Sequence, residues 1–393
     1  MTQAQVSQSD PPPGFIDLGI GHPSYSLLPM EMLHQASEKY FATKDPHPLQ
    51  YGLEQGNSNF RQDLARFLTS AYGRGSVDPN LLFVTTGASS AIDLICSVFT
   101  SPGDVIFVEE PSYFLALRIF RDHGLRVVPV AVDDSGLCLD GLEVKIEESH
   151  PKLIYIIPTF QNPSGVTLSE ERREKLVELA ERYDVLIMAD EVYHLLAYNQ
   201  TPPRSFATLI EHAEHVISVN SFSKILAPGL RLGWVHANRE IIQRLISSSL
   251  LDSGGGMNPF TSAVVHGLIE SGGLEQNIAN LRREYTLRLS AMDAALEQHL
   301  PAARWLPPHG GFFFWVNLPG VDAAHLRSKS QDFHVGLREG ALFTNRTGGM
   351  RDYFRLSFSF YDPIQIQEGL KRIRNCVESS FKDIPAIPTS AGE

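Results

Sequence analysis

Residues 221–234 read Ser-Phe-Ser-Lys-Ile-Leu-Ala-Pro-Gly-Leu-Arg-Leu-Gly-Trp. This stretch follows the apolar run Val216–Val219, so we expect Lys224 just beyond the end of a buried strand. Small, hydroxylic and apolar residues surround this lysine, and such surroundings lower the pKa of an amine and suit Schiff-base chemistry. Arg231 follows after the turn signal Pro228-Gly229. A lone lysine in a loop is more often an ordinary surface residue, so the interpretation depends on the rest of the chain.

Short apolar runs alternate with amphipathic stretches through the middle of the sequence. One such stretch has a helical period from Leu176 to Tyr183, and Thr167–Glu170 before it reads as a capping box. Strands that alternate with helices predict an α/β fold whose mostly parallel sheet has helices on both faces, with functional groups beyond the carboxyl ends of the strands. The runs expected to be strands are Leu81–Thr85, Val105–Val108, Val127–Val130, Leu153–Ile157, Val185–Ala189, Val216–Val219 and Leu232–His236.

The length of 393 residues exceeds one ordinary compact core. Beyond residue 270, apolar positions spaced by three and four residues predict one amphipathic helix of about 26 residues, long enough to link two domains. Gly310–Leu318 and Tyr353–Phe358 then read as strands of a smaller α+β unit. We therefore expect four parts: an N-terminal arm and helix that pack with the small domain (1–50), a large α/β domain (51–272), the linking helix with the small C-terminal domain (273–382) and a flexible tail (383–393).

Composition excludes several classes of protein. Hydrophobic residues make up 43% and charged residues 20%, which is ordinary globular usage. The net charge of −12 argues against a surface that binds nucleic acid. The three cysteines have no metal-ligand or redox spacing, and neither a secretory signal nor a membrane-spanning run is visible. We therefore expect a cytoplasmic protein with no metal, no membrane contact and no nucleic-acid partner.

Further motifs follow other predicted strands, and each has a plain structural alternative. Residues 85–89 (Thr-Thr-Gly-Ala-Ser) open a helix whose first backbone N–H groups are free to bind an anion. Residues 162–165 (Asn-Pro-Ser-Gly) also read as a generic turn. Asp190 ends a buried run, with Tyr193 three residues later, and is either a helix N-cap or a carboxylate that meets a cation. Together with Tyr113, these groups should reach the same edge of one sheet.

The order and spacing of these motifs resemble fold-type-I pyridoxal-5′-phosphate enzymes, specifically the class I and II aminotransferases. The similarity is greatest to the branch with aromatic, kynurenine and 2-aminoadipate aminotransferases. It covers the chain from about Ile16 to Arg374, and residues 221–234 are its most specific segment.

The resemblance implies a role for each residue around the cofactor. Lys224 would hold it as a Schiff base and shuttle a proton, while Asp190 would keep the ring nitrogen protonated so that the ring withdraws electrons. Asn162 and Tyr193 would hydrogen-bond the phenolic oxygen, and Tyr113 would lie against the ring face. The residues implied around the phosphate are Gly87, Ala88, Ser89, Ser221, Ser223, Arg231 and Tyr51.

Four residues complete the implied site. Tyr51 stands in a segment similar to the family's Tyr-Gly-x-x-x-Gly motif, whose tyrosine reaches the phosphate of the partner subunit, so a homodimer is implied. Arg355 would grip the substrate α-carboxylate with its planar guanidinium, and Gly21 and His22 would line the substrate site. The plain alternatives are a turn aromatic for Tyr51, a solvent-facing strand-edge residue for Arg355 and a turn histidine for His22.

We therefore predict an aminotransferase that moves an amino group from an α-amino acid to a 2-oxo acid by a ping-pong mechanism through Lys224. The alternative is a lyase, cyclase or carbon–carbon bond-forming enzyme of specialised metabolism with the same cofactor, because the shape of the pocket decides which Cα bond breaks. A regulatory module on an inactive scaffold is a third hypothesis, which the intact set of site residues argues against. The sequence does not identify the amino donor or the acceptor.

Overall fold

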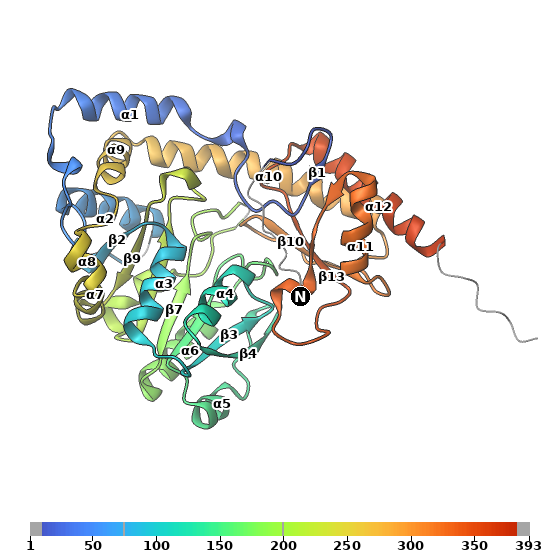
Figure 1. Cartoon of the computed structure of the whole chain (residues 1–393), viewed down its shortest axis with the longest axis horizontal. Coiled ribbons are helices and arrows are strands. Elements are labelled where there is room, and N and C mark those ends of the chain that lie inside the picture. The colour runs from blue at the N-terminus through green and yellow to red at the C-terminus, as the bar shows by residue number, and fades with distance from the viewer. Residues whose placement is uncertain (1–9, 74, 199, 383–393) are drawn as a thin grey trace, which may run out of the picture.

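The computed structural model describes residues 10–73, 75–198 and 200–382 (Figure 1). The tail that we predicted to be flexible, 383–393, lies outside the described residues. The helices are α1 Met30–Ala42, α2 Ser58–Tyr72, α3 Ala88–Phe99, α4 Phe114–Asp122, α5 Leu142–Ser149, α6 Glu170–Tyr183, α7 Arg239–Ile246, α8 Ser249–Gly254, α9 Pro259–Glu270, α10 Gly273–His299, α11 Ala323–Ser330 and α12 Pro363–Lys382.

An eight-stranded sheet forms the centre of the larger part of the molecule. Its strand order is β2-β9-β8-β7-β6-β3-β4-β5, and the pairs from β8 through β4 are parallel. β9 is antiparallel to both of its neighbours, and β5 is antiparallel to β4. Each of the seven predicted runs is a strand of this sheet: β2 Leu82–Thr85, β3 Val105–Glu110, β4 Arg126–Asp133, β6 Leu153–Ile156, β7 Leu186–Asp190, β8 Val216–Ser221 and β9 Gly233–Ala237, to which β5 Gly136–Leu137 is added.

Helices cover both faces of this sheet. In β6, Leu153 and Tyr155 belong to one hydrophobic cluster, whereas Ile154 and Ile156 belong to another. The first cluster includes side chains of α3 and α4, and the second includes side chains of α5 and α6. Because successive side chains of a strand point to opposite faces, this division confirms the predicted α/β class.

The predicted capping box is wrong, because the N-cap lies two residues later than predicted. Ser169, not Thr167, is the N-cap of α6, and its hydroxyl accepts a hydrogen bond from the backbone N–H of Arg172. Thr167 is used elsewhere, because its hydroxyl accepts from the backbone N–H of Phe160 at 3.2 Å. The hydroxyl that caps the helix is therefore the one directly before its first acidic turn.

The C-terminal part begins with the long helix that the sequence predicted. α10 spans 27 residues and packs against α12. In Figure 1, α10 runs from the region of α9 towards the C-terminal strands. There, β10 Phe313–Asn317, β13 Tyr353–Ser357 and β12 Arg338–Glu339 form an antiparallel sheet in which β13 is central.

The N-terminal segment is divided between the two parts of the molecule. β1 Ile16–Asp17 pairs with β11 Val335–Gly336, as expected for an arm on the C-terminal part. The prediction that the helix of this arm also packs there is wrong, because α1 lies against α9. Gly267 of α9 has no side chain to separate the two helices, and Lys39 forms an ion pair with Glu270 at 3.0 Å. Within the described ranges, no helix combines the length and apolarity needed to cross a lipid bilayer.

Candidate active site

The predicted site motifs meet at one edge of the eight-stranded sheet. The parallel strands β7 and β8 end with Asp190 and Ser221, and Lys224 follows the second of them. β9 runs the other way, so its first residue, Gly233, pairs with both Ser221 and Thr85 at this same edge. The topology thereby places Arg231, two residues before β9, beside the start of α3.

Asp190 is buried, and only one of its two carboxylate oxygens has a hydrogen-bond partner among the described residues. Its Oδ2 accepts a hydrogen bond of 2.9 Å from the Tyr155 hydroxyl, whereas its Oδ1 is buried and has no hydrogen-bond partner among the described residues. Burial raises the pKa of this carboxyl to about 6, against the lowering effects of the Tyr155 hydroxyl, the Val192 backbone N–H and the charge of Lys224. A turn, not a helix, follows Asp190, so the N-cap alternative does not apply. The free Oδ1 suits a cationic ring nitrogen.

Lys224 shares this space with Asp190. Its Nζ donates a hydrogen bond of 2.9 Å to the carbonyl oxygen of Gly21 and lies 5.5 Å from the centroid of the Phe312 ring. Its pKa is lowered to about 8, chiefly by burial and also by the charge of Arg355, against the raising effect of Asp190. A lysine with this pKa has a substantial neutral fraction near neutral pH, as an amine that reacts with a carbonyl group requires.

Arg355 lies on the central strand of the C-terminal sheet and is buried, so it is not a solvent-facing edge residue. Its guanidinium donates to Asn162 Oδ1 at 2.8 Å and to the carbonyl oxygen of Gly19 at 2.9 Å. Its Nε is buried without a hydrogen-bond partner among the described residues. The guanidinium carbon lies 4.0 Å from the ring centroid of Phe313. Burial lowers the pKa to about 10, and this cation has only neutral hydrogen-bond partners, so it suits a carboxylate ligand.

A cradle for an anion lies at the start of α3. Gly87 is the N-cap of this helix, provides no side-chain cap and has a φ of +95°. A Cβ atom at Gly87 would lie 3.0 Å from a guanidinium nitrogen of Arg231. The hydroxyls of Ser221 and Ser223 lie 2.9 Å apart. Backbone N–H groups at a helix N-terminus, a guanidinium and hydroxyls are the donors that bind phosphate, and Ala88 and Ser89 occupy the first turn.

The aromatic residues predicted for the site differ in their surroundings. Tyr193 is buried, with its ring edge-on to Phe312 at 5.5 Å, and Tyr113 lies near Asp190, where burial and that charge raise its pKa to about 12. The His22 ring packs edge-on against the ring of Phe360, and burial lowers the pKa of His22. Tyr51 differs from these, because it is 74% exposed in the single chain.

Two buried residues behind the site were not predicted. Tyr155 is the hydrogen-bond donor to Asp190. Glu109 accepts hydrogen bonds from the backbone N–H of Ile157 and from Gln161, and burial raises its pKa to about 8. The sequence did contain a signal for both residues, since a tyrosine stands inside the apolar run of β6 and a glutamate inside that of β3. Buried polar groups need hydrogen-bond partners, so each of them indicated a further polar group nearby.

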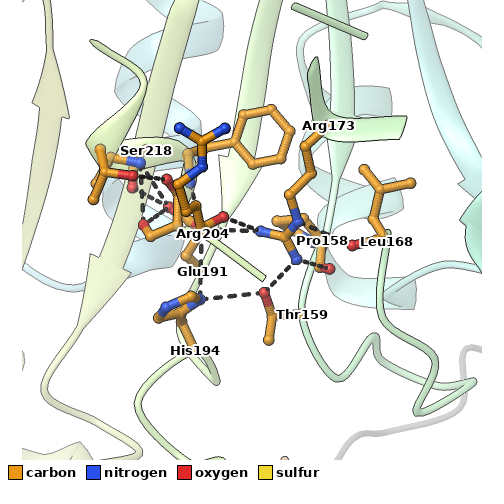
Figure 2. Close-up of polar contacts among 12 residues, drawn as sticks. Pro158, Thr159, Leu168, Arg173, Glu191, His194, Arg204 and Ser218 are labelled. Carbon is orange, nitrogen blue, oxygen red and sulfur yellow. Dashed lines mark hydrogen bonds and ion pairs between the residues drawn. The ribbon is translucent and has the colours of Figure 1, made fainter. Parts of the chain in front are cut away.

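A buried charge network surrounds Glu191, the residue that follows Asp190 in the chain (Figure 2). Glu191 accepts hydrogen bonds from two serine hydroxyls and two backbone N–H groups, and its carboxylate lies 3.9 Å from the Arg173 guanidinium. Arg173 also donates to the carbonyl oxygens of Pro158 and Leu168, at the two ends of the loop that carries Asn162. The network therefore fixes the Asn162 loop relative to the end of β7.

The chain is similar to known proteins over nearly its whole length. Residues 13–373 match the family model for aminotransferase class I and II. The chain is 34% identical over 378 residues to aromatic-amino-acid aminotransferase 1 of Thermococcus litoralis, which covers 93% of this chain and 89% of that protein. The structure of Pyrococcus horikoshii kynurenine aminotransferase matches with a TM-score of 0.87 and 32% identity, covering 93% and 91% of the two chains. α-Aminoadipate aminotransferase from Thermus thermophilus, solved with N-(5′-phosphopyridoxyl)-L-leucine, matches with a TM-score of 0.86 and 28% identity, covering 94% of each chain.

Proposed function

The chain belongs to the class I and II aminotransferases and is a pyridoxal-5′-phosphate-dependent aminotransferase, and from this premise we propose that the residues at the sheet edge form its active site. The observation that carries the proposal is the pairing of a buried lysine of lowered pKa with a buried carboxylate whose Oδ1 has no partner among the described residues. The donor set at the start of α3 fits the cofactor phosphate. A lyase on the same scaffold is not favoured.

The cofactor, when bound, supplies an aldehyde that condenses with amines and a ring that withdraws electrons from the substrate Cα. Asp190 would hold the protonated ring nitrogen through its free oxygen. The Lys224 amine would take the proton from the substrate Cα and deliver it to the cofactor C4′ carbon, and the same residue would move the proton in reverse when a 2-oxo acid is the substrate. Arg355 would bind the α-carboxylate and so orient the Cα–H bond.

The test of this assignment is Lys224→Ala. We expect borohydride reduction of the wild-type enzyme, followed by peptide mass spectrometry, to find the cofactor mass on the peptide that contains Lys224. The variant should bear no such mass and should lose roughly 10³-fold or more in turnover, since it lacks its general base. Covalent cofactor on another lysine, or full turnover by the variant, would refute the assignment.

We also propose that the amino donor has an aromatic or other bulky uncharged side chain. The Arg355 guanidinium lies 4.0 Å and 5.1 Å from the ring centroids of Phe313 and Phe343. The neighbouring cation Arg338 is paired with Asp17, and Arg346 is paired with Glu110. A second carboxylate on the substrate would therefore compete for cations that already have partners. The similarity to an aromatic-amino-acid aminotransferase supports the same choice.

A panel of phenylalanine, tyrosine, kynurenine and 2-aminoadipate, each with 2-oxoglutarate or pyruvate, tests this choice. We expect kcat/KM for the aromatic donors to exceed that for 2-aminoadipate by about tenfold or more, because the side-chain carboxylate of 2-aminoadipate would be buried as an unpaired charge. A preference for 2-aminoadipate would contradict it. Oxo-acid formation without any acceptor would indicate a lyase instead.

We propose that the enzyme is a homodimer in which Tyr51 reaches the phosphate of the partner subunit. In the single chain, Leu49 is 67% exposed, Leu53 58% and Phe41 59%, and a groove of about 660 Å³ lies between this segment, α1 and α9. Exposed apolar side chains around a groove are typical of a surface that a second copy covers. Light scattering coupled to gel filtration should give the mass of a dimer, and Leu49→Asp with Leu53→Asp should give a monomer. A wild-type monomer would refute the proposal.

Two further points about the whole chain are proposals. We assign residues 51–272 to a large cofactor-binding domain and 273–382 to the linking helix and small domain, because each part has its own sheet. We place the enzyme in the cytoplasm, because Cys96, Cys138 and Cys376 are all free, as in a reducing compartment.

A further inference from the structure

Tyr155 lies in the middle of β6, one strand away from Asp190. β6 and β7 are parallel, with Tyr155 opposite Met188, so the tyrosine ring reaches along the sheet towards the end of β7. The residue is fully buried, and its ring packs edge-on against Phe120 at 5.2 Å. Its hydroxyl donates a hydrogen bond of 2.9 Å to Asp190 Oδ2. The packing of the ring therefore fixes the position of this donor.

The two oxygens of the Asp190 carboxylate have different surroundings. Oδ2 accepts from the phenol, whereas Oδ1 is buried and has no hydrogen-bond partner within the described part of the chain. Rotation of the carboxylate would exchange the two oxygens or break the bond to Tyr155. The phenol therefore selects one orientation of the carboxylate, and this orientation leaves one oxygen free for a ligand.

The other acid near Tyr155 does not compete for its hydroxyl. Glu109 accepts its two hydrogen bonds from the backbone N–H of Ile157 and from the amide of Gln161. Burial raises the pKa of Glu109 to about 8, so it carries a proton at neutral pH and adds no negative charge beside Asp190. Of these two buried acids, Asp190 is thus the one that holds a negative charge, and its phenol partner also stabilises that charge.

We propose that Tyr155 is a positioning residue for the aminotransferase reaction, which holds the Asp190 carboxylate ionised and turned so that Oδ1 meets the cofactor ring nitrogen. This inference rests on the proposed role of Asp190. Tyr155 itself touches neither substrate nor cofactor. Its effect on the reaction passes through the carboxylate.

The substitution Tyr155→Phe removes the hydroxyl and keeps the ring. We expect the dissociation constant of pyridoxal 5′-phosphate from the apoenzyme to rise by about tenfold, because a hydrogen bond to a charged group is lost. Losing this donor also destabilises the ionised carboxylate, so the acid limb of cofactor binding should move to higher pH by about one unit. Both are measured by fluorescence titration of the apoenzyme across roughly pH 5 to 8, a range that includes the Asp190 pKa of about 6.

Tyr285→Phe is the matched control. Tyr285 is also fully buried, but its hydroxyl has no hydrogen-bond partner within the described residues. We expect this variant to leave the cofactor affinity and the acid limb unchanged. Thermal unfolding of both apoproteins separates folding from positioning, because a purely structural role would lower the melting temperature of Tyr155→Phe without moving the acid limb.

Asp190→Asn separates this inference from the proposed function. If Asp190→Asn binds the cofactor and turns over like the wild type, the assignment of Asp190 itself is wrong. If Asp190→Asn is impaired while Tyr155→Phe matches the wild type in affinity and acid limb, only the role of Tyr155 is refuted. If both are impaired, adding Tyr155→Phe to Asp190→Asn should produce no further loss of affinity, since the hydroxyl acts through the carboxylate. An additive loss would contradict the inference.

Discussion

At the residue scale, Asp190, Arg355 and Lys224 are ionisable side chains whose buried surroundings do not fully compensate their charges. Asp190 and Arg355 each have a buried polar atom without a partner within the described chain, and burial lowers the pKa of Lys224. Burial of a charge is unfavourable unless opposite charges or hydrogen bonds compensate it. In the proposed site, a cofactor and an amino acid would supply the partners that these side chains lack.

The geometry of Arg355 makes its replacement by lysine a severe change. The guanidinium bridges Asn162 and Gly19 and lies over Phe313, and a lysine has neither the fork nor the planar face for these contacts. We expect Arg355→Lys to raise KM for the amino acid by roughly tenfold to a hundredfold, through loss of a hydrogen bond to a charged group. Steady-state kinetics measure this. The surface variant Arg351→Lys, which changes an exposed pair with Asp322, should leave KM unchanged, and equal KM values for both variants would contradict the role of Arg355.

The pKa of Lys224 predicts how the apoenzyme reacts with its cofactor at different pH. Only the neutral amine attacks the aldehyde, so the rate of covalent attachment should rise with pH around a midpoint near 8, not near the usual value of 10.5. The guanidinium of Arg355 helps to lower this pKa, so Arg355→Gln should move the midpoint to higher pH. Stopped-flow absorbance of the apoenzyme mixed with cofactor measures both rates. A midpoint that Arg355→Gln leaves unchanged or moves down would show that the two groups are not coupled.

At the element scale, the strands that the sequence predicted are those with apolar side chains on both faces. β7 is an example, because Ile187 and Met188 contact different clusters on opposite sides of the sheet. The two-residue strands β5 and β12 have no period of their own and exist only through pairing with neighbours. The local sequence pattern therefore predicts the strands that are apolar on both faces, but it does not predict β5 and β12.

The same distinction explains which site residues could be predicted. Lys224 and Asp190 follow predicted strands, and parallel topology brings strand ends to one edge without any knowledge of register. Tyr155 lies inside a strand, and its contact with Asp190 depends on the register of β6 against β7. The position of α1 was missed for a similar reason, because it depends on packing against α9, which is distant in sequence.

We predict that Arg173 and Arg172, neighbours in α6, contribute very differently to the stability of the fold. The Arg173 guanidinium is buried and holds both ends of the Asn162 loop (Figure 2). We expect Arg173→Met to lower the free energy of unfolding by about 3–5 kcal/mol, because Glu191 would lose its buried cation and the loop its donors. Urea unfolding of the apoprotein measures this loss.

Arg172→Met is the control for this prediction. Arg172 forms a partly exposed ion pair with Asp133 and also donates to the carbonyl oxygens of Gly136 and Leu137. Because water can replace these partners, we expect a smaller loss than for Arg173→Met, about 1–2 kcal/mol. A loss for Arg173→Met no larger than that for Arg172→Met would contradict the view that the buried network holds the loop.

At the scale of the whole molecule, the site joins the two sheets. Arg355 of the C-terminal sheet donates to Asn162 of the larger part, and Arg346 pairs with Glu110 at the end of β3 at 2.5 Å. The substrate carboxylate would therefore be bound by one part and the cofactor by the other. Relative motion of the two parts would change the distance between Arg355 and Lys224, so both must be placed together for turnover.

Subunit complementation tests whether Tyr51 serves the partner's site. In a heterodimer of Lys224→Ala with Tyr51→Ala, a site that takes its lysine from one chain and its tyrosine from the other has both native residues. Purified through two different tags, this heterodimer should have about half of the wild-type activity, because one of its two sites is complete. A heterodimer of the wild type with the double variant contains the same two substitutions but combines each native residue with a mutated one, so it should have little activity. If Tyr51 instead serves its own chain, the two heterodimers exchange behaviour: the first becomes the inactive one and the second keeps half of the activity. The comparison therefore separates the two arrangements at constant composition, and the activity of the Tyr51→Ala homodimer, which we expect to be low, sets the size of the difference between the two heterodimers.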